Sequence, residues 1–543
     1  MWKSTIFLDK ILAVLFGSWL GYITLGPAAL DFFNISWMRD DVAQYYVGWG
    51  FFRHGTSWQL PLLWSSDLGY PLGICAADLD VIPPLALLFR LFSPILPQTF
   101  QYFGPYGVAC CILQLYFGLK LCRKLAPARP LAALAGALFV GCAPPFIFRL
   151  YAGQFALSSH WLILAALTYL YGQEATGSIF LSLMGINIVA AAVNPYIAAM
   201  VFLLSIGAIG RRTRQNRRLV QLLAIFVVSL GTMSLAGFLS GGTVGGGYGQ
   251  YSMNLLAPID PMKFPSLILP AQRDHFVDQY EGYNYLGAGA ILLGICALVR
   301  RPALLLRTAL EDRFAVQRWV FLISLLLALS VCATAGTWVI YYIPVPARVF
   351  DALSAFRSSG RLFWPGYYIL LLAILAAVLK AFPGRAGTLL IGAAFLLQFF
   401  DTASLRAASF QMWDRPPVVS PLRAPVWATL GQRYRHLVVL PAWQCFPYRN
   451  NGQDTPGGFP GYQIFGFLAI GQHMSVNDFY AARMSGPQTR YFCHDETDEL
   501  RRNGPAADTA YVFALGDPLA GAVDHRNGVV CRPTDGFALC TGK

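Results

Sequence analysis

The sequence contains few charged residues for its length. Asp, Glu, Lys and Arg make up 12% of the 543 residues, whereas hydrophobic residues make up 56%. Soluble proteins carry roughly 25% charged residues. A chain with so little charge cannot surround itself with solvated side chains, so the composition excludes an ordinary soluble enzyme and indicates a polytopic membrane protein.

Several familiar motifs are also absent. The chain has no Walker loop, no dinucleotide fingerprint, no H-E-x-x-H and no G-x-S-x-G, which argues against a nucleotide-driven pump and against a hydrolase. The net charge is +13, but no stretch combines a basic run with aromatic residues, so we expect no nucleic-acid partner. No internal repeat of roughly 20–50 residues is found.

Long apolar runs dominate the first three quarters of the chain. A membrane helix needs about 20 mostly apolar residues, and the sequence predicts about eleven such spans. They fall near residues 11–31, 100–121, 130–147, 158–173, 178–193, 196–210, 219–239, 285–299, 319–336, 362–381 and 387–402. No convincing cleavage site follows residues 1–30, so we expect the first segment to be retained as a helix.

The positions of the basic residues predict the orientation in the membrane. Lys and Arg gather at alternate ends of the predicted spans and should face the cytoplasm. They include Lys3, Lys10, Lys120, Arg123, Lys124, Arg129, Arg211, Arg212, Arg214, Arg217, Arg218, Arg300, Arg301, Arg307, Arg313, Arg318, Lys380 and Arg385. This pattern places the N-terminus in the cytoplasm and everything after about residue 403 outside it.

Three long loops should therefore face outward, at about residues 32–99, 240–284 and 337–361. In the first of them, residues 83–96 are apolar but carry Arg90 and two prolines at 83 and 84. The run is too short and broken to span a bilayer, so we expect a helix lying in the membrane interface.

The composition changes after about residue 403, where polar residues rise and apolar runs shorten. Residues 436–440, 509–515 and 528–531 are predicted strands, and residues 475–484 and 495–502 are predicted short helices. The predicted domains are thus a transmembrane domain at 1–402 and an extracytoplasmic α/β domain at 403–543, of about 140 residues.

Four of the eleven cysteines lie in this polar C-terminal part: Cys445, Cys493, Cys531 and Cys540. An even number outside the cytoplasm permits two disulfides. The segment 531–540 has the pattern of a hairpin, so Cys531–Cys540 is the preferred pair and Cys445–Cys493 remains. Four free thiols are the alternative.

The strongest candidate for catalysis is an acidic pair, Asp40 and Asp41, at the start of the first outer loop. A charge near hydrocarbon loses hydration, so two adjacent carboxylates there need a compensating partner or exposure to water. A carboxylate against a low-dielectric wall can act as a general base. Aromatic residues surround the pair, as at a membrane interface: Trp37, Tyr45, Tyr46, Trp49, Phe51 and Phe52. An acidic helix end at the membrane surface is the simpler interpretation.

Asp78 and Asp80 form a second acidic cluster in the same loop. In an extended chain this spacing places both carboxylates on one side, where they can share a divalent cation such as Mg²⁺ or Mn²⁺. A solvated loop is an equally good interpretation.

Candidate substrate-binding residues lie in the outer segments. Arg149, Tyr151 and His160 sit near the outer ends of the third and fourth predicted spans, although an arginine there can also simply reach lipid headgroups. Arg357 and Arg361 come just before a span, at a spacing that puts both on one helix face. Guanidinium groups bind phosphate bidentately, which suits a lipid-linked phosphate.

The loop at 240–284 adds Tyr248, in a glycine-rich stretch, and Glu281. Glycines allow close approach of the backbone, and Tyr and Asn side chains suit sugar hydroxyls. Glycine-rich loops are also simply flexible, so this pattern alone is weakly specific.

The combination of an early acidic pair, an interface helix, about eleven spans and an extracytoplasmic C-terminal domain resembles the GT-C superfamily of membrane glycosyltransferases. The blocks 48–54, 101–104, 248–254, 280–286 and 359–365 are similar to a largely uncharacterised bacterial branch of it. The resemblance covers residues 1–402 and, more loosely, the tail.

The resemblance implies transfer of a sugar from a polyprenyl-phosphate donor to a glycan or lipid acceptor, at the outer face of the bacterial plasma membrane, usually with inversion. Asp40 or Asp41 would then be the base, and Arg357 and Arg361 would hold the departing phosphate. Base and leaving group would face each other across one cavity. Some members use a divalent metal and others do not. A transporter or flippase of lipid-linked sugars is the alternative.

Overall fold

The computed structural model describes residues 2–55, 58–172, 176–213, 215–240, 242, 247–302, 314–445, 461–480 and 484–542. The chain forms two compact units. The helical unit comprises Met1–Phe32, Tyr102–Thr232 and Gly245–Arg415, and the sheet unit comprises Phe33–Gln101, Met233–Val244 and Pro416–Lys543. The predicted first outer loop therefore folds with the C-terminal residues, a grouping that the sequence did not predict. The boundary at 402/403 stays a prediction.

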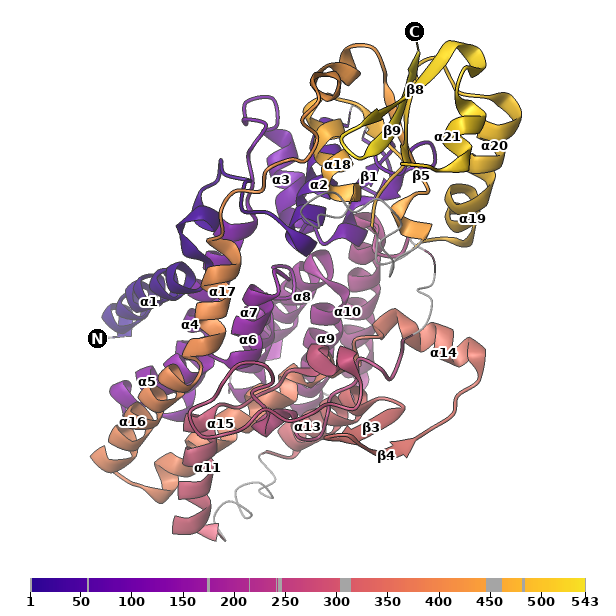
Figure 1. Cartoon of the computed structure of the whole chain (residues 1–543). Coiled ribbons are helices and arrows are strands. Elements are labelled where there is room, and N and C mark those ends of the chain that lie inside the picture. Colours follow the sequence, from indigo (N-terminus) through magenta and orange to yellow (C-terminus); the bar gives the residue numbers. More distant parts are fainter. Residues whose placement is uncertain are drawn as a thin grey trace. The chain divides into compact units, whose positions relative to one another are not determined.

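The first half of the helical unit is a series of helices (Figure 1). They are α1 (Trp2–Leu30), α4 (Phe103–Leu125), α5 (Pro130–Gly141), α6 (Pro144–Tyr151), α7 (His160–Tyr171), α8 (Thr176–Val193), α9 (Pro195–Arg212) and α10 (Gln215–Ala236). Helix α1 is kinked at Gly26, which precedes Pro27, because a proline inside a helix removes a backbone hydrogen bond.

Its second half alternates helices with shorter segments. These elements are η2 (Ala257–Ile259), η3 (Val277–Gly282), α11 (Ala288–Arg300), α13 (Ala315–Leu329), β3 (Cys332–Ala335), β4 (Trp338–Tyr342), α14 (Ala347–Leu353), η5 (Ser354–Phe356), η6 (Ser359–Phe363), α15 (Trp364–Ala381), α16 (Arg385–Asp401) and α17 (Ala403–Trp413). Strands β3 and β4 pair antiparallel.

The predicted spans all fall on helices, but the number that can cross a membrane is smaller than predicted. Among the described residues, five helices are long and apolar enough, or six if α16 and α17, bent by 44°, form one span. Helices at the remaining predicted spans are shorter. A count of eleven is thus not confirmed. The span predicted at 319–336 is wrong at its end, because α13 stops at Leu329 and strand β3 follows.

Helices α1 and α4 pack closely against each other. A Cβ at Gly17 would lie 2.5 Å from the Cα atom of Ile112, so only glycine permits this approach of the two backbones. Asp9 on α1 and Arg123 on α4 form an ion pair of 2.6 Å. Arg123 belongs to the basic cluster predicted to be cytoplasmic, so this contact joins two helix ends that were expected on one side.

The sheet unit is built on a five-stranded sheet in the order β6-β5-β7-β9-β8. Strands β6, β5 and β7 are parallel, and β9 pairs antiparallel with both β7 and β8. The strands are β5 (His436–Leu440), β6 (Ser475–Val476), β7 (Thr509–Ala514), β8 (Val529–Thr534) and β9 (Phe537–Gly542).

Helices flank this sheet on both faces. The remaining elements of the unit are α2 (Asp40–His54), β1 (Trp64–Ser65), β2 (Ile74–Cys75), η1 (Ala76–Leu79), α3 (Pro83–Leu91), η7 (Pro425–Gln432), η8 (Trp443–Cys445), α18 (Gly461–Gly471), α19 (Gly486–Arg490), the π-helix η9 (Tyr491–Asp495), α20 (Glu496–Asn503), α21 (Pro518–Val523) and η10 (Arg526–Gly528).

Alternating side chains of the strands bury opposite faces of the sheet. Val438 and Phe513 lie in one core cluster with Leu500 of α20 and Val523 of α21. The other side is covered by α18, whose Phe465 ring lies 5.1 Å from that of Phe537. Helix α18 in turn contacts α2. The sheet unit therefore has its layers in the order α20/α21, sheet, α18, α2.

Residues of the predicted first outer loop also extend the edge of the sheet. The amides of Gly69 and Tyr70 donate to the carbonyl of Val476, and the amide of Val476 donates to the carbonyl of Asp67. These main-chain hydrogen bonds continue the sheet beyond β6, which explains why residues 33–101 and the C-terminal residues form one body.

Most of the predictions for the C-terminal part are confirmed. The three predicted strands correspond to β5, β7 and β8, and the helix predicted at 495–502 is α20. The helix predicted at 475–484 is wrong, because Ser475 and Val476 pair in parallel with His436 and Leu437. Helix α18 was not predicted.

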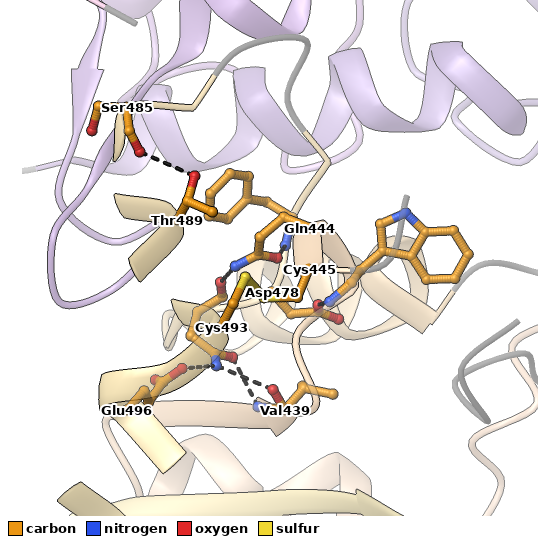
Figure 2. Close-up of a disulfide and its surroundings, with 11 residues drawn as sticks. Val439, Gln444, Cys445, Asp478, Ser485, Thr489, Cys493 and Glu496 are labelled. Atoms are coloured by element: carbon orange, nitrogen blue, oxygen red, sulfur yellow. Dashed lines mark hydrogen bonds between the residues drawn. A yellow bond between two sulfur atoms is a disulfide. The ribbon is translucent and has the colours of Figure 1, made fainter. Parts of the chain in front are cut away.

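Both predicted disulfides are present, Cys445–Cys493 and Cys531–Cys540. Figure 2 shows the first, next to buried polar groups. There the Asn477 side chain bonds both the amide and the carbonyl of Val439 and donates to Glu496 at 2.9 Å.

The predicted interface helix is present as α3. Leu88, Leu91, Phe92 and Ile95, on this helix or just after it, are exposed. Arg90 instead points inward, and its guanidinium carbon lies 4.1 Å from the ring centre of Trp58. An exposed apolar face of this kind is what a helix lying in the membrane interface presents to lipid.

Candidate functional site

The acidic pair begins α2. Asp40 and Asp41 form its first turn, where carboxylates are favoured by the helix dipole. Both residues are exposed, so neither is enclosed by an apolar wall as expected. Asp40 has a φ of 51°, which is rare for a residue other than glycine. The Gln463 side chain donates to the Asp40 carbonyl at 2.8 Å and so ties the start of α2 to α18.

The aromatic residues around the pair have a different role from the one predicted. Trp37, Tyr46 and Trp49 are buried, as are Tyr45, Phe51 and Phe52. The Tyr46 hydroxyl donates to the carbonyl of Gln98, and the Trp49 indole donates to that of Phe100. These side chains hold α2 within the sheet unit rather than lining a membrane interface.

The residues do not fit the predicted divalent cation site. Asp78 lies in the 3₁₀ helix η1, and Asp80 ends that helix in a left-handed conformation, so the chain here is not the extended one on which the prediction of a shared cation rested. Throughout the described ranges, no group of three or more His, Cys, Asp or Glu side chains is arranged to hold a metal ion.

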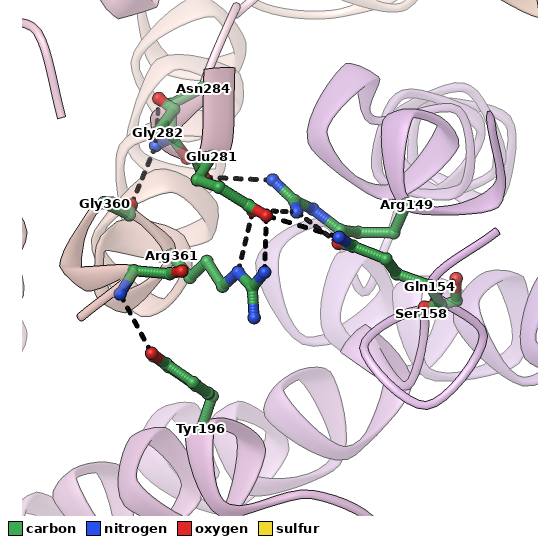
Figure 3. Close-up of polar contacts among 10 residues, drawn as sticks. Arg149, Gln154, Ser158, Tyr196, Glu281, Gly282, Asn284, Gly360 and Arg361 are labelled. Carbon is green, nitrogen blue, oxygen red and sulfur yellow. Dashed lines mark hydrogen bonds and ion pairs between the residues drawn. The ribbon is translucent and has the colours of Figure 1, made fainter. Parts of the chain in front are cut away.

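The helical unit contains a buried charge cluster centred on Glu281 (Figure 3). Arg361 binds the Glu281 carboxylate bidentately at 2.8 and 2.6 Å, and Arg149 approaches the same carboxylate at 2.5 Å. Arg149 also donates to the Glu281 main-chain carbonyl at 3.0 Å. The cluster joins α6, η3 and η6, which are far apart in the sequence.

Neighbouring groups fix the geometry of this cluster. Gln154 accepts from Arg149 at 2.5 Å and donates to Glu281 at 3.3 Å. Burial alone would raise the pKa of Glu281, but the guanidinium groups of Arg361 and Arg149 outweigh it and hold that pKa well below its usual range. Glu281 therefore stays ionised and is not a proton carrier at neutral pH.

The cluster brings together three of the predicted substrate-binding residues: Arg149, Glu281 and Arg361. His160 lies deeper in the helical unit, where its Nδ1 is 2.8 Å from the Tyr368 hydroxyl. Tyr151 packs edge-on against Phe264, at 5.1 Å between ring centres. Tyr248 is half-buried and makes no contact that joins it to the cluster in the described part of the chain.

Arg357 and Arg361 do not act as the matched pair that was predicted. A break at Ser358 separates η5 from η6, so the i,i+4 spacing does not place both on one face. The Arg357 guanidinium lies over the ring of Tyr251 at 5.4 Å, whereas Arg361 turns inward to Glu281. The common helix face expected for Arg357 and Arg361 is therefore not formed, and their binding of a phosphate stays a prediction.

The sequence patterns did not single out Gln114 or Tyr368 as members of these networks. Gln114 donates to the Tyr368 hydroxyl at 2.7 Å, so this hydroxyl joins α4 and α7. A polar residue inside an apolar span is the signal that could have identified Gln114. Tyr368 offers no such signal, because tyrosine is common in spans near an interface.

These observations define a class of protein: a helical membrane protein with a buried charge cluster and a mixed α/β C-terminal fold. The chain belongs to the family described as Domain of unknown function (DUF6311), whose profile matches residues 14–403. The profile of the DUF6311 C-terminal domain matches residues 426–542. No curated protein matches the chain.

Two solved structures show a distant likeness to the chain. One is the oligosaccharyltransferase of Archaeoglobus fulgidus in the apo form, with 9% identity and a TM-score of 0.42 over 93% of this chain and 69% of that one. The other is oligosaccharyltransferase AglB of the same organism in complex with an inhibitory peptide and a dolichol-phosphate, with 10% identity and a TM-score of 0.42 over 100% and 74%. TM-scores at this level do not establish a common fold.

Proposed function

We propose that the protein is a membrane glycosyltransferase that moves a sugar from a polyprenyl-phosphate donor to a glycan or lipid acceptor, at the extracytoplasmic face of a bacterial plasma membrane. The observation that carries it is the cluster of Arg149, Glu281 and Arg361. Two guanidinium groups share one carboxylate, so these three side chains together carry one net positive charge. Guanidinium groups bind phosphate through paired N–H donors and keep their charge at all physiological pH, so the phosphate of a lipid-linked donor is a ligand that suits this cluster.

Arg361 is the member of the cluster that a phosphate can reach. Its side chain is 12% exposed, against 0% for Arg149. Arg149 and Glu281 position Arg361, because the bidentate contact fixes the plane of its guanidinium. In the transfer, the bond between the anomeric carbon and the phosphate oxygen breaks, and Arg361 stabilises the negative charge left on polyprenyl phosphate.

Asp40 or Asp41 acts as the general base. The acceptor hydroxyl gives its proton to the carboxylate, and its oxygen forms the new bond to the anomeric carbon. The exposure of both carboxylates suits contact with an acceptor that arrives from water. The acidic pair and the arginine cluster belong to different compact units, so the expectation that they face one cavity stays a prediction.

The test separates the two roles. Asp40→Asn and Asp41→Asn should each be assayed in the full chain with a radiolabelled hexose on polyprenyl phosphate and a cell-envelope extract as acceptor. We expect at least one of them to lose transfer but to retain photo-crosslinking to polyprenyl phosphate. Arg361→Gln should lose both. Asp351→Asn and Arg348→Gln, at exposed positions, are the matched controls.

Full transfer activity in both Asp variants would remove the proposed base. Movement of the labelled lipid across the bilayer without any transfer, in wild-type protein, would favour the transporter alternative.

A further inference from the structure

The sheet unit contains a cavity that the proposed chemistry does not use. It has a volume of about 460 Å³ and lies between the C-terminal end of α2, the end of α18 and the sheet edge formed by β5 and β6. Its size lies within the usual range of small-molecule sites, roughly 300–1,000 Å³. Its polar lining residues are His54, Asp67, Arg435, His436, His473 and Ser475.

Three of these polar groups make no hydrogen bond or ion pair with their side-chain atoms among the residues that the structure describes. Within the described ranges, the Asp67 carboxylate and the Arg435 guanidinium make no hydrogen bond or ion pair. The Nε2 atom of His54 is buried and has no hydrogen-bond partner either. Asp67 is half-buried and Arg435 is exposed, so water can reach both, but buried polar groups are nearly always satisfied in native proteins, and the unsatisfied Nε2 of His54 therefore indicates a polar ligand.

The charge of the cavity argues against an ionic ligand. The Asp67 carboxylate and the Arg435 guanidinium carry opposite charges, so these two groups add no net charge to the cavity. Burial, and then the charges of Arg53 and His473, lower the pKa of His54 to about 4. The His54 imidazole is therefore neutral at physiological pH, and its Nε2 can donate or accept a hydrogen bond, depending on the tautomer. Asp67 would repel a phosphate, and Arg435 would repel a metal ion.

Aromatic groups add flat surfaces to the polar ones. His436 stacks on Tyr70 with 4.0 Å between ring centres and 10° between ring planes. The ring of His54 meets that of His473 edge-on at 5.2 Å. Phe51 and Ile470 complete the apolar part of the lining. Flat apolar surfaces beside hydrogen-bonding groups suit a ring with one apolar face and a hydroxylated edge.

A nucleophilic role for Ser475 is not supported, although a chain of three suitable residues exists. Ser475 Oγ lies 2.6 Å from His436 Nδ1, and His436 Nε2 lies 3.6 Å from Asp508. However, the amides of Ser475, Val476 and Asn477 all donate to main-chain carbonyls. None of them is left to stabilise an oxyanion, which acyl transfer requires. This chain of contacts instead holds the His436 ring in place.

We infer that this cavity is a binding site for a neutral sugar ring. Asp67 accepts hydrogen bonds from two neighbouring hydroxyls, Arg435 donates to others, and His54 contributes through its unpaired Nε2. Each hydroxyl of a sugar ring can both donate and accept a hydrogen bond, so the ring can satisfy the donors and the acceptors of the cavity together. A phosphate, a metal ion or an apolar ligand cannot do so.

The position of the cavity gives it a place in the proposed reaction. His54 is the last residue of α2 and Asp40 is the first, so the two lie about 20 Å apart along a helix that rises about 1.5 Å per residue. If the proposed function is correct, the cavity holds a sugar of the acceptor glycan that is remote from the reacting hydroxyl. Only this assignment to the acceptor rests on the proposed function.

The test measures binding, not transfer, so it can fail or succeed independently of the proposed function. Saturation-transfer NMR and calorimetry on the full-length protein in detergent would use the methyl glycosides of glucose, galactose, mannose, rhamnose and N-acetylglucosamine. We expect at least one glycoside to bind. Asp67→Asn should weaken its binding about tenfold, because a charge-assisted hydrogen bond is lost, and Arg435→Gln should also weaken it.

Asp498→Asn, at an exposed position on α20, is the matched control and should bind like the wild type. Among the described residues, neither the Asp67 nor the Arg435 side chain makes a hydrogen bond or ion pair that supports the fold, so both variants should keep an unfolding temperature close to that of the wild type. The inference is overturned if no glycoside binds, if Asp67→Asn binds as tightly as the control, or if inorganic phosphate or Zn²⁺ binds at this site in place of the glycosides.

Discussion

The side chain of Gln463 donates a hydrogen bond of 2.8 Å to the main-chain carbonyl of Asp40, across 423 residues of sequence. Gln463 is itself buried. The contact joins the first turn of α2, where the candidate base lies, to α18 of the C-terminal part. The backbone of the acidic pair is thus positioned by a residue that no local pattern connects with it.

This contact predicts a specific effect of Gln463→Leu. The variant keeps the side-chain volume but leaves the Asp40 carbonyl without its donor, at a cost of about 1 kcal/mol. We expect faster hydrogen exchange at the amides of Val42 and Ala43, which donate to Arg39 at the start of α2. Gln432→Leu, at an exposed position, is the control. Unchanged exchange in Gln463→Leu would show that the contact does not hold the helix end.

The Glu281 cluster predicts a large loss of stability when Arg149 is removed. Arg149→Gln leaves the Glu281 carboxylate buried with only one guanidinium partner, and breaking a buried ion pair costs about 3 kcal/mol or more. We expect a clearly lower unfolding temperature for the full chain in detergent. Arg348→Gln, an exposed position, should change the free energy of unfolding by no more than about 0.5 kcal/mol. Equal unfolding temperatures for the two variants would contradict the structural role of the cluster.

The sheet unit should lose stability as the pH rises. Burial raises the pKa of Asp478 to about 8, an effect that the hydrogen bond from the Trp443 amide only partly offsets. In the unfolded chain this carboxyl titrates near about 4. Between these values only the folded state holds the proton, so the free energy of unfolding decreases as the pH rises from about 4 to about 8.

Burial also raises the pKa of Glu496 to about 8, so the two acids act in the same direction. Hydrogen exchange of the β6 and α20 amides across this pH range would measure the effect, after correction for the intrinsic exchange rate. Asp478→Asn should reduce the dependence of this protection on pH, and Asp498→Asn should leave that dependence unchanged. Protection that increases with pH would contradict the assignment.

The disulfides predict which cysteines can be labelled. After mild reduction of intact cells, the half-buried Cys445, Cys493 and Cys531 should react with a membrane-impermeant maleimide if the C-terminal part faces outward, whereas Cys540 is buried in the sheet core and should react more slowly. Cys110, Cys111, Cys122 and Cys142 are buried free thiols and should stay unlabelled. Labelling that appears only after lysis would reverse the predicted orientation.

Much of the local structure could be predicted from the sequence. The apolar runs marked the positions of the helices, because helix formation and membrane insertion depend on local composition. The hairpin of β8 and β9 was also predictable, since Cys531 and Cys540 flank a turn with Asp535 and Gly536 in left-handed conformations. Ser475 was misassigned, because its strand conformation depends on pairing with His436, which lies far away in the sequence.

What the sequence alone determined is a chain whose composition requires a membrane, with an acidic pair after its first helix and a disulfide-linked α/β fold at its C-terminal end. Only the tertiary structure decided that residues 33–101 fold with the C-terminal residues, that Arg361 turns to Glu281 rather than joining Arg357, and that His54 and Asp67 line one cavity. The physical reason is that composition and periodicity act over a few turns of chain. The partner of a buried charge is selected instead by packing between segments tens to hundreds of residues apart.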